Sequence, residues 1–373
     1  MKIAINTRFL LSHKMEGFGW YTYEIVRRIV KNHPEHQFFF FFDRPFDEKF
    51  IFSENVTPIV LSPKARHPFL FYIWFEISVA KALKKHEIDL FFSPDGYLSL
   101  NSDVKQVCTI HDINFEHNPE DLTWLVRKYY RYFFPKFARK AEHILTVSEY
   151  SKKDIIEMYG IPENKITAVW NGASDVFQSL QKKEKSRVRE NYANGEEYFL
   201  FVGALSPRKN LKRLIQAFSL FKKTNSKSDI QLVIVGEELW KKSNHGIKIE
   251  SSIKKQIHLT GHIPLEELAK VMAAAKLFTY VPYFEGFGIP LVEAMKCGTP
   301  ILSGDRTSLP EVAGDAAIYC DPFNVEDIAQ KMIDLSENPK LLTELSQKGL
   351  ERSKEFSWNI AADKVWNVLK DFL

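Results

Sequence analysis

Glu285 and Glu293 belong to the segment FEGFGIPLVEAMKCGTP (284–300), in which Gly286 and Gly288 lead from an apolar run into a predicted helix. The helix is expected to open near Gly288. A helix N-terminus presents free N–H groups and the positive end of its dipole, and so suits an anion such as diphosphate. Carboxylates at such positions can accept hydrogen bonds from sugar hydroxyls. The pattern favours a binding site, and its alternative is a glycine-containing turn with two solvated glutamates.

Arg208 and Lys209 form a second candidate pair, in the segment GALSPRKNLKRLIQAF (203–218). They fall between an apolar run and an amphipathic helix, which places them at the carboxyl end of a predicted strand. An arginine beside a lysine offers a planar fork and a point charge to a pair of phosphates. A solvated basic turn is the alternative. A position on the same sheet edge as the Glu285 loop favours a joint phosphate site.

The first half of the chain has a weaker glycine signal in MEGFGWYTYEIVRRI (15–29). Gly17 and Gly19 follow the first apolar run and its loop, where backbone could approach a ligand closely. The pair forms G-x-G but does not complete G-x-G-x-x-G, so a dinucleotide cofactor is poorly supported. A plain strand-to-helix turn is the alternative.

His111 and Asp112 stand at the end of another apolar run, in TIHDINFEHNPE (109–120). Polar side chains at a strand end are suited to binding or to proton transfer. A metal site made by these two residues and His117 is disfavoured, because the further ligands of a closed site are not apparent. The chain also lacks the G-x-S-x-G motif of serine hydrolases.

Short apolar runs alternate with amphipathic segments along the chain, and this rhythm predicts the framework that positions these residues. The runs are continuous, as expected of parallel strands covered on both faces. In the first half we expect strands at 2–6, 37–43, 88–94, 105–112, 143–149 and 165–172. In the second half we expect strands at 198–205, 229–237, 257–263, 276–283, 299–305 and 316–322. The predicted fold class is α/β, with two Rossmann-like doubly wound parallel sheets that face a cleft.

A polar segment without strand signal, 179–197, separates the two halves. We therefore expect an N-terminal domain over 1–178 and a C-terminal domain over 179–356. The last segment, 357–373, has a broad apolar stripe at helical spacing, and Ser357 before it is the expected N-cap.

Composition narrows the class of protein. The 373 residues are 45% hydrophobic and 26% charged, which matches ordinary globular proteins. A net charge of +4 gives no general case for nucleic-acid binding. Cys108, Cys297 and Cys320 are odd in number and far apart, which argues against a disulfide framework and indicates a reducing compartment.

Membrane signals are limited to one stretch. The N-terminal apolar run contains Arg8 and so lacks the unbroken core of a signal peptide. The apolar stretch 68–80 is short and contains Glu76, so we expect no spanning helix. The basic aromatic stretch 127–140 leaves two interpretations open: contact with anionic lipid, or one solvated face of a core helix.

Nearly the whole chain resembles the retaining glycosyltransferases of family 4, also called glycosyltransferase group 1, which have the GT-B fold. In the second half the resemblance rests on the blocks GALSPRKNLKRLIQAF, LTGHIPLEELAKVMAAAKLF, EGFGIPLVEAMKCGTPIL and SLPEVAGDAAIYCDP. In the first half, GFGWYTYEIVRR, IHDINFEHNPE, TVSEYSKKDIIEMYGIPENKI and VWNGAS are similar to the subgroup rich in mannosyltransferases of polysaccharide and O-antigen synthesis.

The resemblance implies that the C-terminal helix 357–373 crosses back and completes the N-terminal domain. It also implies a role for each candidate residue. Glu285 would bind the donor sugar beside the reacting carbon, and His111 would lie on the acceptor side of that carbon, which makes them the expected catalytic residues. Glu293 would bind the nucleotide ribose, while Arg208 and Lys209 would clamp the diphosphate. The donor-binding residues implied in this way are Gly17, Gly19, Gly203, Arg208, Lys209, Gly236, His262, Ile263, Gly286, Phe287, Gly288, Ile289 and Glu293.

The implied reaction is hexosyl transfer with retention, in which the leaving phosphate takes the acceptor proton and neither a metal nor a cofactor is required. GDP-mannose is the first expectation for the donor and a UDP-sugar the second. The acceptor would be a glycan or a lipid-linked saccharide, in the cytoplasm or at the inner face of the cell membrane. The alternatives are an epimerase or phosphorylase of the same fold, or a non-catalytic protein that binds nucleotide sugars.

The chain departs from the family pattern at three places. Trp20 stands where the subgroup commonly has arginine, and Tyr283 stands where serine is usual. The stretch GDRT (304–307) is atypical. A charge contact from position 20 is therefore not expected.

Overall fold

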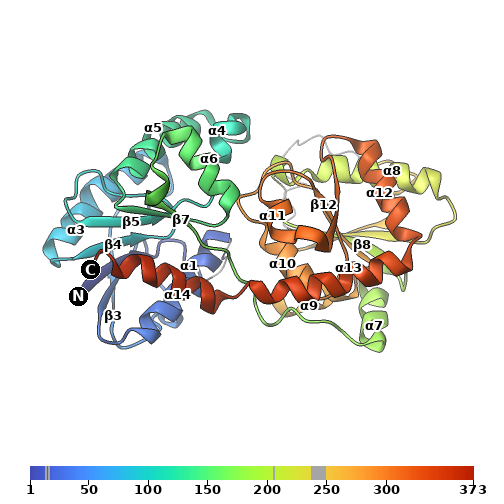
Figure 1. Cartoon of the computed structure of the whole chain (residues 1–373), viewed down its shortest axis with the longest axis horizontal. Coiled ribbons are helices and arrows are strands. Elements are labelled where there is room, and N and C mark those ends of the chain that lie inside the picture. Colours follow the sequence, from blue (N-terminus) through green and yellow to red (C-terminus); the bar gives the residue numbers. More distant parts are fainter. Residues whose placement is uncertain (13–14, 16, 205, 237–248) are drawn as a thin grey trace. The chain divides into compact units, whose positions relative to one another are not determined.

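The computed structural model describes residues 1–12, 15, 17–204, 206–236 and 249–373 of the chain. These residues form two compact units, one of Met1–Asn171 together with Ser357–Leu373 and one of Gly172–Phe356. The chain therefore passes between the units twice (Figure 1). Each unit is an α/β domain built on one parallel sheet, as predicted.

The first unit contains a seven-stranded sheet in the order β3-β2-β1-β4-β5-β6-β7, and every pairing in it is parallel. Its strands are β1 (Lys2–Asn6), β2 (Gln37–Phe42), β3 (Val56–Val60), β4 (Leu90–Ser93), β5 (Lys105–Thr109), β6 (His143–Thr146) and β7 (Ile166–Ala168). The six strands expected here are present, and β3 is additional. It is an edge strand that contains Pro58, which cannot donate a ladder hydrogen bond and so weakened the strand signal.

Helices cover both faces of this sheet. They are α1 (Gly17–Asn32), α2 (Pro68–Ile73), α3 (Ala80–Lys85), α4 (Asn114–His117), α5 (Trp124–Lys140), α6 (Glu149–Tyr159) and α14 (Trp358–Lys370). Single helical turns lie at η1 (Glu48–Phe50), η3 (Pro119–Asp121) and η4 (Glu163–Lys165). The π-helical turn η2 (Trp74–Val79) joins α2 to α3 without a break, so 68–85 is one helical segment.

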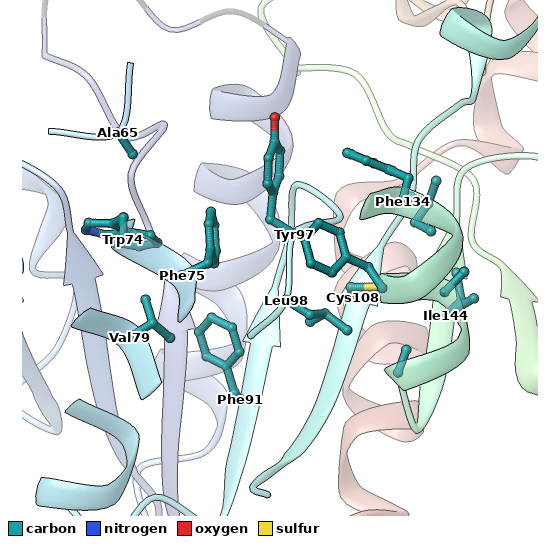
Figure 2. Close-up of a cluster of buried hydrophobic side chains, with 14 of the residues drawn as sticks. Ala65, Trp74, Phe75, Val79, Phe91, Tyr97, Leu98, Cys108, Phe134 and Ile144 are labelled. Atoms are coloured by element: carbon teal, nitrogen blue, oxygen red, sulfur yellow. The ribbon is translucent and has the colours of Figure 1, made fainter. Parts of the chain in front are cut away.

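The core of the first unit explains why the segment 68–85 is so apolar. Figure 2 shows Trp74 and Phe75 of this segment beside Phe91 of β4 and Tyr97. The rings of Phe75 and Tyr97 stack with centroids 5.1 Å apart. Tyr97 also contacts the ring of Phe134 on α5 at 5.3 Å. One side of 68–85 is therefore buried in protein.

The last helix, α14, belongs to the first unit and packs on α1. The hydroxyl of Ser357 accepts a hydrogen bond from the backbone N–H of Asn359 at 3.2 Å, so Ser357 is the N-cap as predicted. Trp366 stacks on His33 of α1 with ring centroids 3.8 Å apart, and Arg28 donates to the Asn359 side chain at 2.6 Å. A ring stack and a side-chain hydrogen bond thus hold α14 on α1, and the apolar stripe of α14 is buried.

The second unit contains a six-stranded sheet in the order β10-β9-β8-β11-β12-β13, again with parallel pairings. Its strands are β8 (Tyr198–Val202), β9 (Gln231–Val235), β10 (Ile257–Gly261), β11 (Leu277–Tyr280), β12 (Ile301–Gly304) and β13 (Ala317–Cys320). All six were predicted. The order reverses between β8 and β11, where a doubly wound sheet opens a crevice at the carboxyl ends of its strands.

The helices of this unit are α7 (Lys182–Ala193), α8 (Leu211–Thr224), α9 (Leu265–Ala274), α10 (Ile289–Lys296), α11 (Leu309–Ala313), α12 (Val325–Ser336) and α13 (Pro339–Arg352). Single turns lie at η5 (Pro207–Lys209), η7 (Lys254–Gln256), η8 (Gly314–Ala316) and η9 (Ser353–Glu355). The polar segment 179–197 contains α7, which packs against α9. The guanidinium of Arg189 on α7 donates to the carbonyl of Ala274 at 3.2 Å.

Candidate active site

The loop between β11 and α10 holds the glutamate segment. Gly288 is the N-cap of α10, and its φ of 94° lies in the left-handed region that favours glycine. A Cβ at this position would also lie 3.0 Å from the Leu309 side chain. Pro290 in the first turn supports the helix start, because proline there sacrifices no intrahelical bond. The helix begins directly after Gly288, where the sequence places it.

Glu285 is the point at which both candidate loops meet. Its carboxylate is buried, with Oε2 3.0 Å from Nη1 of Arg208 and Oε1 2.6 Å from Nζ of Lys209. Strands β8 and β11 are neighbours in the sheet, so the loops that follow them share one edge. The structure therefore brings together the three charged residues that sequence reasoning assigned to a joint site.

Tyr280 is a further member of this cluster that sequence reasoning missed. It is the last residue of β11 and is fully buried. Lys209 donates from Nζ to the Tyr280 hydroxyl at 2.6 Å. Its place at the carboxyl end of a strand, before the Glu285 loop, was the signal that could have identified it.

The two glutamates have different electrostatic surroundings. Burial acts to raise the pKa of Glu285, but Arg208 and Lys209 outweigh it and hold that pKa below its ordinary value. Burial raises the pKa of Glu293 to about 7, against a smaller opposing effect of Lys209. The site therefore combines an ionised carboxylate with one that titrates near neutral pH.

Two of the three departures from the family pattern belong to this region: Tyr283 lies in the loop itself, and the GDRT stretch (304–307) contacts it. Tyr283 stacks on Phe323 with ring centroids 5.5 Å apart. The guanidinium carbons of Arg306 and Arg213 lie 5.1 and 5.0 Å from the centroid of the same Phe323 ring. Tyr283 also donates its backbone N–H to the carbonyl of Arg208 at 3.1 Å. Aromatic stacking thus supports the backbone between the two charged loops.

Thr307 and Ser308 hold the backbone of Glu285 itself. The N–H of Glu285 donates to Oγ1 of Thr307 at 3.1 Å, and the hydroxyl of Ser308 donates to the Glu285 carbonyl at 2.9 Å. Thr307 has a φ of 57°, an uncommon conformation for a branched residue. Both residues were outside the predicted site.

The predicted glycines Gly203 and Gly236 end the neighbouring strands β8 and β9. A Cβ on Gly236 would lie 2.2 Å from the carbonyl oxygen of Gly203, so the two backbones are in direct contact. Gly236 also donates to the carbonyl of Gly261 at 3.1 Å. His262, the next residue, is exposed and Ile263 is half-buried. These positions line the same carboxyl edge as Arg208.

The remaining predicted donor residues of this unit lie around the start of α10. Gly286 and Phe287 are buried, and Ile289 is the first helical residue. The ring of Phe287 contacts that of Phe356 with centroids 5.9 Å apart. The Phe287 side chain thus packs within the unit. The polar groups that this turn can offer to a ligand are therefore those of its backbone.

In the first unit, His111 follows β5 and is partly exposed. Its Nε2 lies 2.8 Å from the Pro94 carbonyl, and its ring contacts those of Phe18 at 4.8 Å and Tyr21 at 4.6 Å. Burial lowers its pKa despite that carbonyl and the nearby Asp112. Burial therefore favours the neutral form of the His111 imidazole.

The His111, Asp112 and His117 set does not converge. His117 lies on α4 with Nε2 2.8 Å from a carboxylate oxygen of Asp154. Asp112 accepts a hydrogen bond from the backbone of Asn114 at 3.0 Å. Among the residues that the structure describes, no group of three or more His, Cys, Asp or Glu side chains is placed to hold a metal ion.

Gly17 and Gly19 lie in the first turn of α1. Gly17 is exposed, and a Cβ there would meet no atom within 4 Å. Gly19 is buried, and a Cβ there would lie 2.7 Å from the Phe9 carbonyl oxygen. The glycines follow the first strand and its loop, as expected, and the close approach at Gly19 is to the protein's own backbone.

Comparison with known proteins gives the same division of the chain. Residues 15–175 match the family model described as Glycosyltransferase Family 4, and residues 182–352 match the model described as Glycosyl transferases group 1. The chain belongs to glycosyltransferase family 4. Its two parallel-sheet domains have the GT-B fold, as the resemblance implied.

This family 4 glycosyltransferase is similar to curated mannosyltransferases. It is 27% identical to the O-antigen chain mannosyltransferase B of Escherichia coli over 386 aligned positions, which cover 99% of this chain and 100% of that protein. It is 30% identical to the O-antigen chain mannosyltransferase RfbU of Salmonella typhimurium, over 58% of this chain and 57% of that one. Among solved structures, Anabaena Alr3699/HepE in complex with UDP-glucose has a TM-score of 0.77 at 18% identity and full coverage of both chains.

In this glycosyltransferase the edge of the second sheet offers an anion three sources of positive potential. They are the Arg208 fork, the Lys209 ammonium and the N-terminus of α10. The same edge offers the carboxylate of Glu285 as an acceptor for hydroxyl groups. The arrangement can therefore hold a ligand with a negative group beside a polyol.

Proposed function

We propose that this glycosyltransferase is a retaining, metal-independent hexosyltransferase that moves mannose from a nucleotide diphosphate sugar to a glycan or lipid-linked acceptor in cell-surface polysaccharide synthesis. The observation that carries the proposal is the convergence of Arg208 and Lys209 on Glu285 at one sheet edge. A phosphate-binding cation pair next to a hydroxyl-binding carboxylate matches the two halves of a sugar nucleotide.

Donor binding would exchange the partners of the two cations. The diphosphate would take the guanidinium of Arg208 and the ammonium of Lys209, together with the N–H groups at the start of α10. The carboxylate of Glu285 would then accept hydrogen bonds from the hydroxyls of the donor sugar. Glu293, farther along α10, would bind the ribose of the nucleotide.

The transfer step that we propose is the retaining one that the family resemblance implies. The bond between the anomeric carbon and the diphosphate oxygen breaks, and the acceptor oxygen forms its bond on the same face of the sugar. The acceptor proton passes to the departing diphosphate. Arg208 and Lys209 stabilise the charge that develops on the leaving group, which is commonly the largest catalytic contribution. His111, neutral and on the acceptor side, would accept a hydrogen bond from the incoming hydroxyl.

The relatives support the choice of substrates. The full-length similarity is to an O-antigen chain mannosyltransferase, so mannose from GDP-mannose is the first donor to test. A solved structure of the same fold contains UDP-glucose, so UDP-sugars form the second group. We place the reaction in the cytoplasm, and the buried free thiols of Cys108, Cys297 and Cys320 fit a reducing compartment.

A panel of nucleotide sugars with a mannan oligosaccharide acceptor tests the proposal. We expect release of nucleoside diphosphate that depends on the acceptor, and a product whose new linkage keeps the anomeric configuration of the donor by NMR. Glu285→Gln should abolish release, whereas Glu190→Gln on the exposed face of α7 should not. Inversion at the anomeric carbon would overturn the retaining assignment.

The same assay separates the alternatives. A phosphorylase would require inorganic phosphate and give a sugar 1-phosphate, and an epimerase would act without acceptor. A non-catalytic binding protein would retain the sugar nucleotide without cleaving it. Any of these three results would refute the proposed transfer.

A further inference from the structure

Two helical segments of the first unit expose large aromatic side chains next to each other. Phe69 and Tyr72 on α2 are 67% and 43% exposed, and Trp124 and Tyr132 on α5 are each 59% exposed. Phe69, Tyr72 and Tyr132 line an apolar groove of about 470 Å³, together with Pro68, Leu125, Lys128, Tyr129 and Phe133. We name this groove, with Trp124 and Lys136 of α5, the α2–α5 face.

The α2–α5 face rests on a rigid base. Phe71 of α2 contacts the rings of Tyr97 and Tyr129 at 5.6 and 5.7 Å, and Tyr129 stacks on Phe133 at 4.4 Å. Tyr97 in turn belongs to the buried cluster of Figure 2. The exposed rings therefore extend from a packed core, and their exposure is not a result of a loosely held segment.

Cations alternate with aromatic rings along α5. Trp124, Lys128, Tyr132 and Lys136 follow one another at intervals of four residues, which places them in one row on the helix. The ammonium of Lys128 lies 4.2 Å from the Trp124 ring centroid, and that of Lys136 lies 3.4 Å from the Tyr132 centroid. Each ring is thus in cation–π contact with an ammonium group.

The charge of the face has one sign. Helix α5 contains six cations and no acid. The segment 68–85 contains three lysines and a single acid, Glu76. Glu76 is buried, and its carboxylate accepts hydrogen bonds from the backbones of Leu100 and Asn101. Of the cations on α5, Arg131 pairs with Glu116 at 2.9 Å. A partner of this surface must therefore be apolar and negatively charged.

We propose that the α2–α5 face docks on the surface of an anionic phospholipid bilayer. Tyrosine and tryptophan are suited to the depth of the lipid headgroups, where one end of the ring is apolar and the other wet. Lysines beside them can reach lipid phosphates while their stems lie along the rings. A second copy of the same face is a poor partner, because it would bring the two basic rows together.

The contact would be peripheral. Across the described ranges, with their gaps at 13–14, 16, 205 and 237–248, no helix has both the length and the apolar character needed to cross a bilayer. The aromatic rings would insert only to headgroup depth. Such anchoring takes two signals, apolar insertion and charge, and the face contains both. This inference goes beyond the proposed transfer and does not depend on it.

Flotation with lipid vesicles tests the docking. We expect the full chain to bind vesicles of equal parts phosphatidylglycerol and phosphatidylcholine, and to bind pure phosphatidylcholine at least tenfold more weakly. Phe69→Ser with Trp124→Ser, and separately Lys128→Glu with Lys136→Glu, should each weaken binding at least tenfold. These side chains are on the surface, so circular dichroism of both variants should match that of the parent.

Two control variants match these changes elsewhere. Lys182→Glu with Lys183→Glu on α7 makes the same change in charge, and Met158→Ser with Ile360→Ser removes two other exposed apolar side chains. Both should bind vesicles as the parent does. Nucleoside diphosphate release with a soluble acceptor should be unchanged in all four variants, so a failure of docking is distinct from a failure of transfer.

Three results would overturn the inference. The first is equal vesicle binding by the parent and both face variants, and the second is equal binding to neutral and anionic vesicles. The third is a dimer of the parent in solution that Phe69→Ser with Trp124→Ser dissociates, since it would identify a second copy as the occupant of the face.

Discussion

The ammonium nitrogen of Lys209 lies 2.6 Å from a carboxylate oxygen of Glu285. The two residues come from different loops, one after β8 and the other after β11, yet they share one buried contact. A substitution at either residue therefore removes one of the contacts that compensate the buried charge of the other. This coupling shapes the expected results of mutating the site.

We expect Arg208→Ala and Lys209→Ala each to lower kcat/KM for the sugar nucleotide by about 10- to 150-fold. Each removes a charge-assisted bond to phosphate worth about 1.5–3 kcal/mol. Steady-state kinetics with the preferred donor measures the loss, and circular dichroism shows whether the fold is kept. Wild-type rates in both variants would refute the assignment of this pair to the diphosphate.

Lys212→Ala is the control for this pair. Lys212 is exposed on α8, within four positions of Arg208 in the sequence. Lys212→Ala removes one positive charge, as the other two substitutions do, but it leaves the ion pairs of Glu285 with Arg208 and Lys209 in place. We expect its kinetics to equal those of the parent, which would attribute the loss to the site and not to the charge of the whole domain.

The raised pKa of Glu293 predicts a pH-dependent stability. Burial raises this pKa from 4.5 to about 7, so between these values the folded protein holds a proton that the unfolded chain has released. The resulting stabilisation is present below pH 4.5 and is lost as the pH rises through about 7. Glu293→Gln, which is neutral at every pH, should match the parent in Tm at pH 5 and exceed it by about 2–4 °C at pH 8.

Thermal melts at the two pH values check this expectation. Glu190→Gln on α7 removes an exposed carboxylate and should leave the difference in Tm between pH 5 and pH 8 as it is in the parent. A parallel shift of Glu293→Gln at both pH values would show that this carboxylate does not titrate near 7.

Most strands of the two sheets could be predicted because a parallel strand that is buried on both faces has a continuous apolar sequence. The missed strand, β3, is short, lies at the sheet edge and contains Pro58, so its sequence does not resemble a covered strand. Gly17 and Gly19 indicate a close backbone approach, but the sequence does not identify what is approached. At Gly19 the close approach is that of α1 to the Phe9 carbonyl, a contact that only the folded chain reveals.

The charged residues of the site were predicted, but the residues that hold them in position were not. Arg208, Lys209 and Glu285 could be grouped because strand ends meet at one edge of a parallel sheet. Tyr280 also ends a strand at this edge but was missed, and Thr307 could not be identified from a strand end. A tyrosine at the end of an apolar strand is typical of a hydrophobic core. The contact of Thr307 with the Glu285 backbone depends on a left-handed φ that the sequence does not indicate.

Transfer should survive chelation. The leaving group can be neutralised by Arg208, Lys209 and the N-terminus of α10 without a divalent ion. Dialysis against EDTA followed by assay in metal-free buffer should leave the rate within about twofold of the untreated enzyme. Loss of transfer that Mg²⁺ or Mn²⁺ restores would overturn the metal-independent mechanism.

Removal of residues 357–373 should expose apolar surface on α1 and impair transfer more than donor binding. The donor residues of the second unit remain, while the first unit loses the buried stripe formed by Trp358, Ala361, Ala362, Val365, Trp366 and Leu369. Dye binding to exposed apolar surface, nucleotide affinity and transfer rate should be measured on the same preparation. A truncated chain that stays soluble and transfers at the full rate would contradict this role of α14.

A point variant covers the case in which the truncated chain does not fold. Trp366→Ala removes the ring that stacks on His33 and should lower Tm, because a large buried aromatic contact is lost. Asn367→Ala, on the neighbouring position of the same helix, is its control. Equal melting temperatures for the two variants would show that the α1–α14 contact contributes little.

The position of α14 after the whole second unit in the sequence matters while the protein is being made. The strands of the first unit are complete at β7 (Ile166–Ala168), but the helix that covers α1 is translated only after the second unit. At about 5–20 residues per second, a ribosome needs roughly 10–40 s to extend the chain from residue 172 to residue 373. Throughout that interval the nascent first unit presents the apolar face of α1 to other chains. Expression yield should therefore respond to translation speed and chaperone supply more strongly than the stability of the finished protein would suggest.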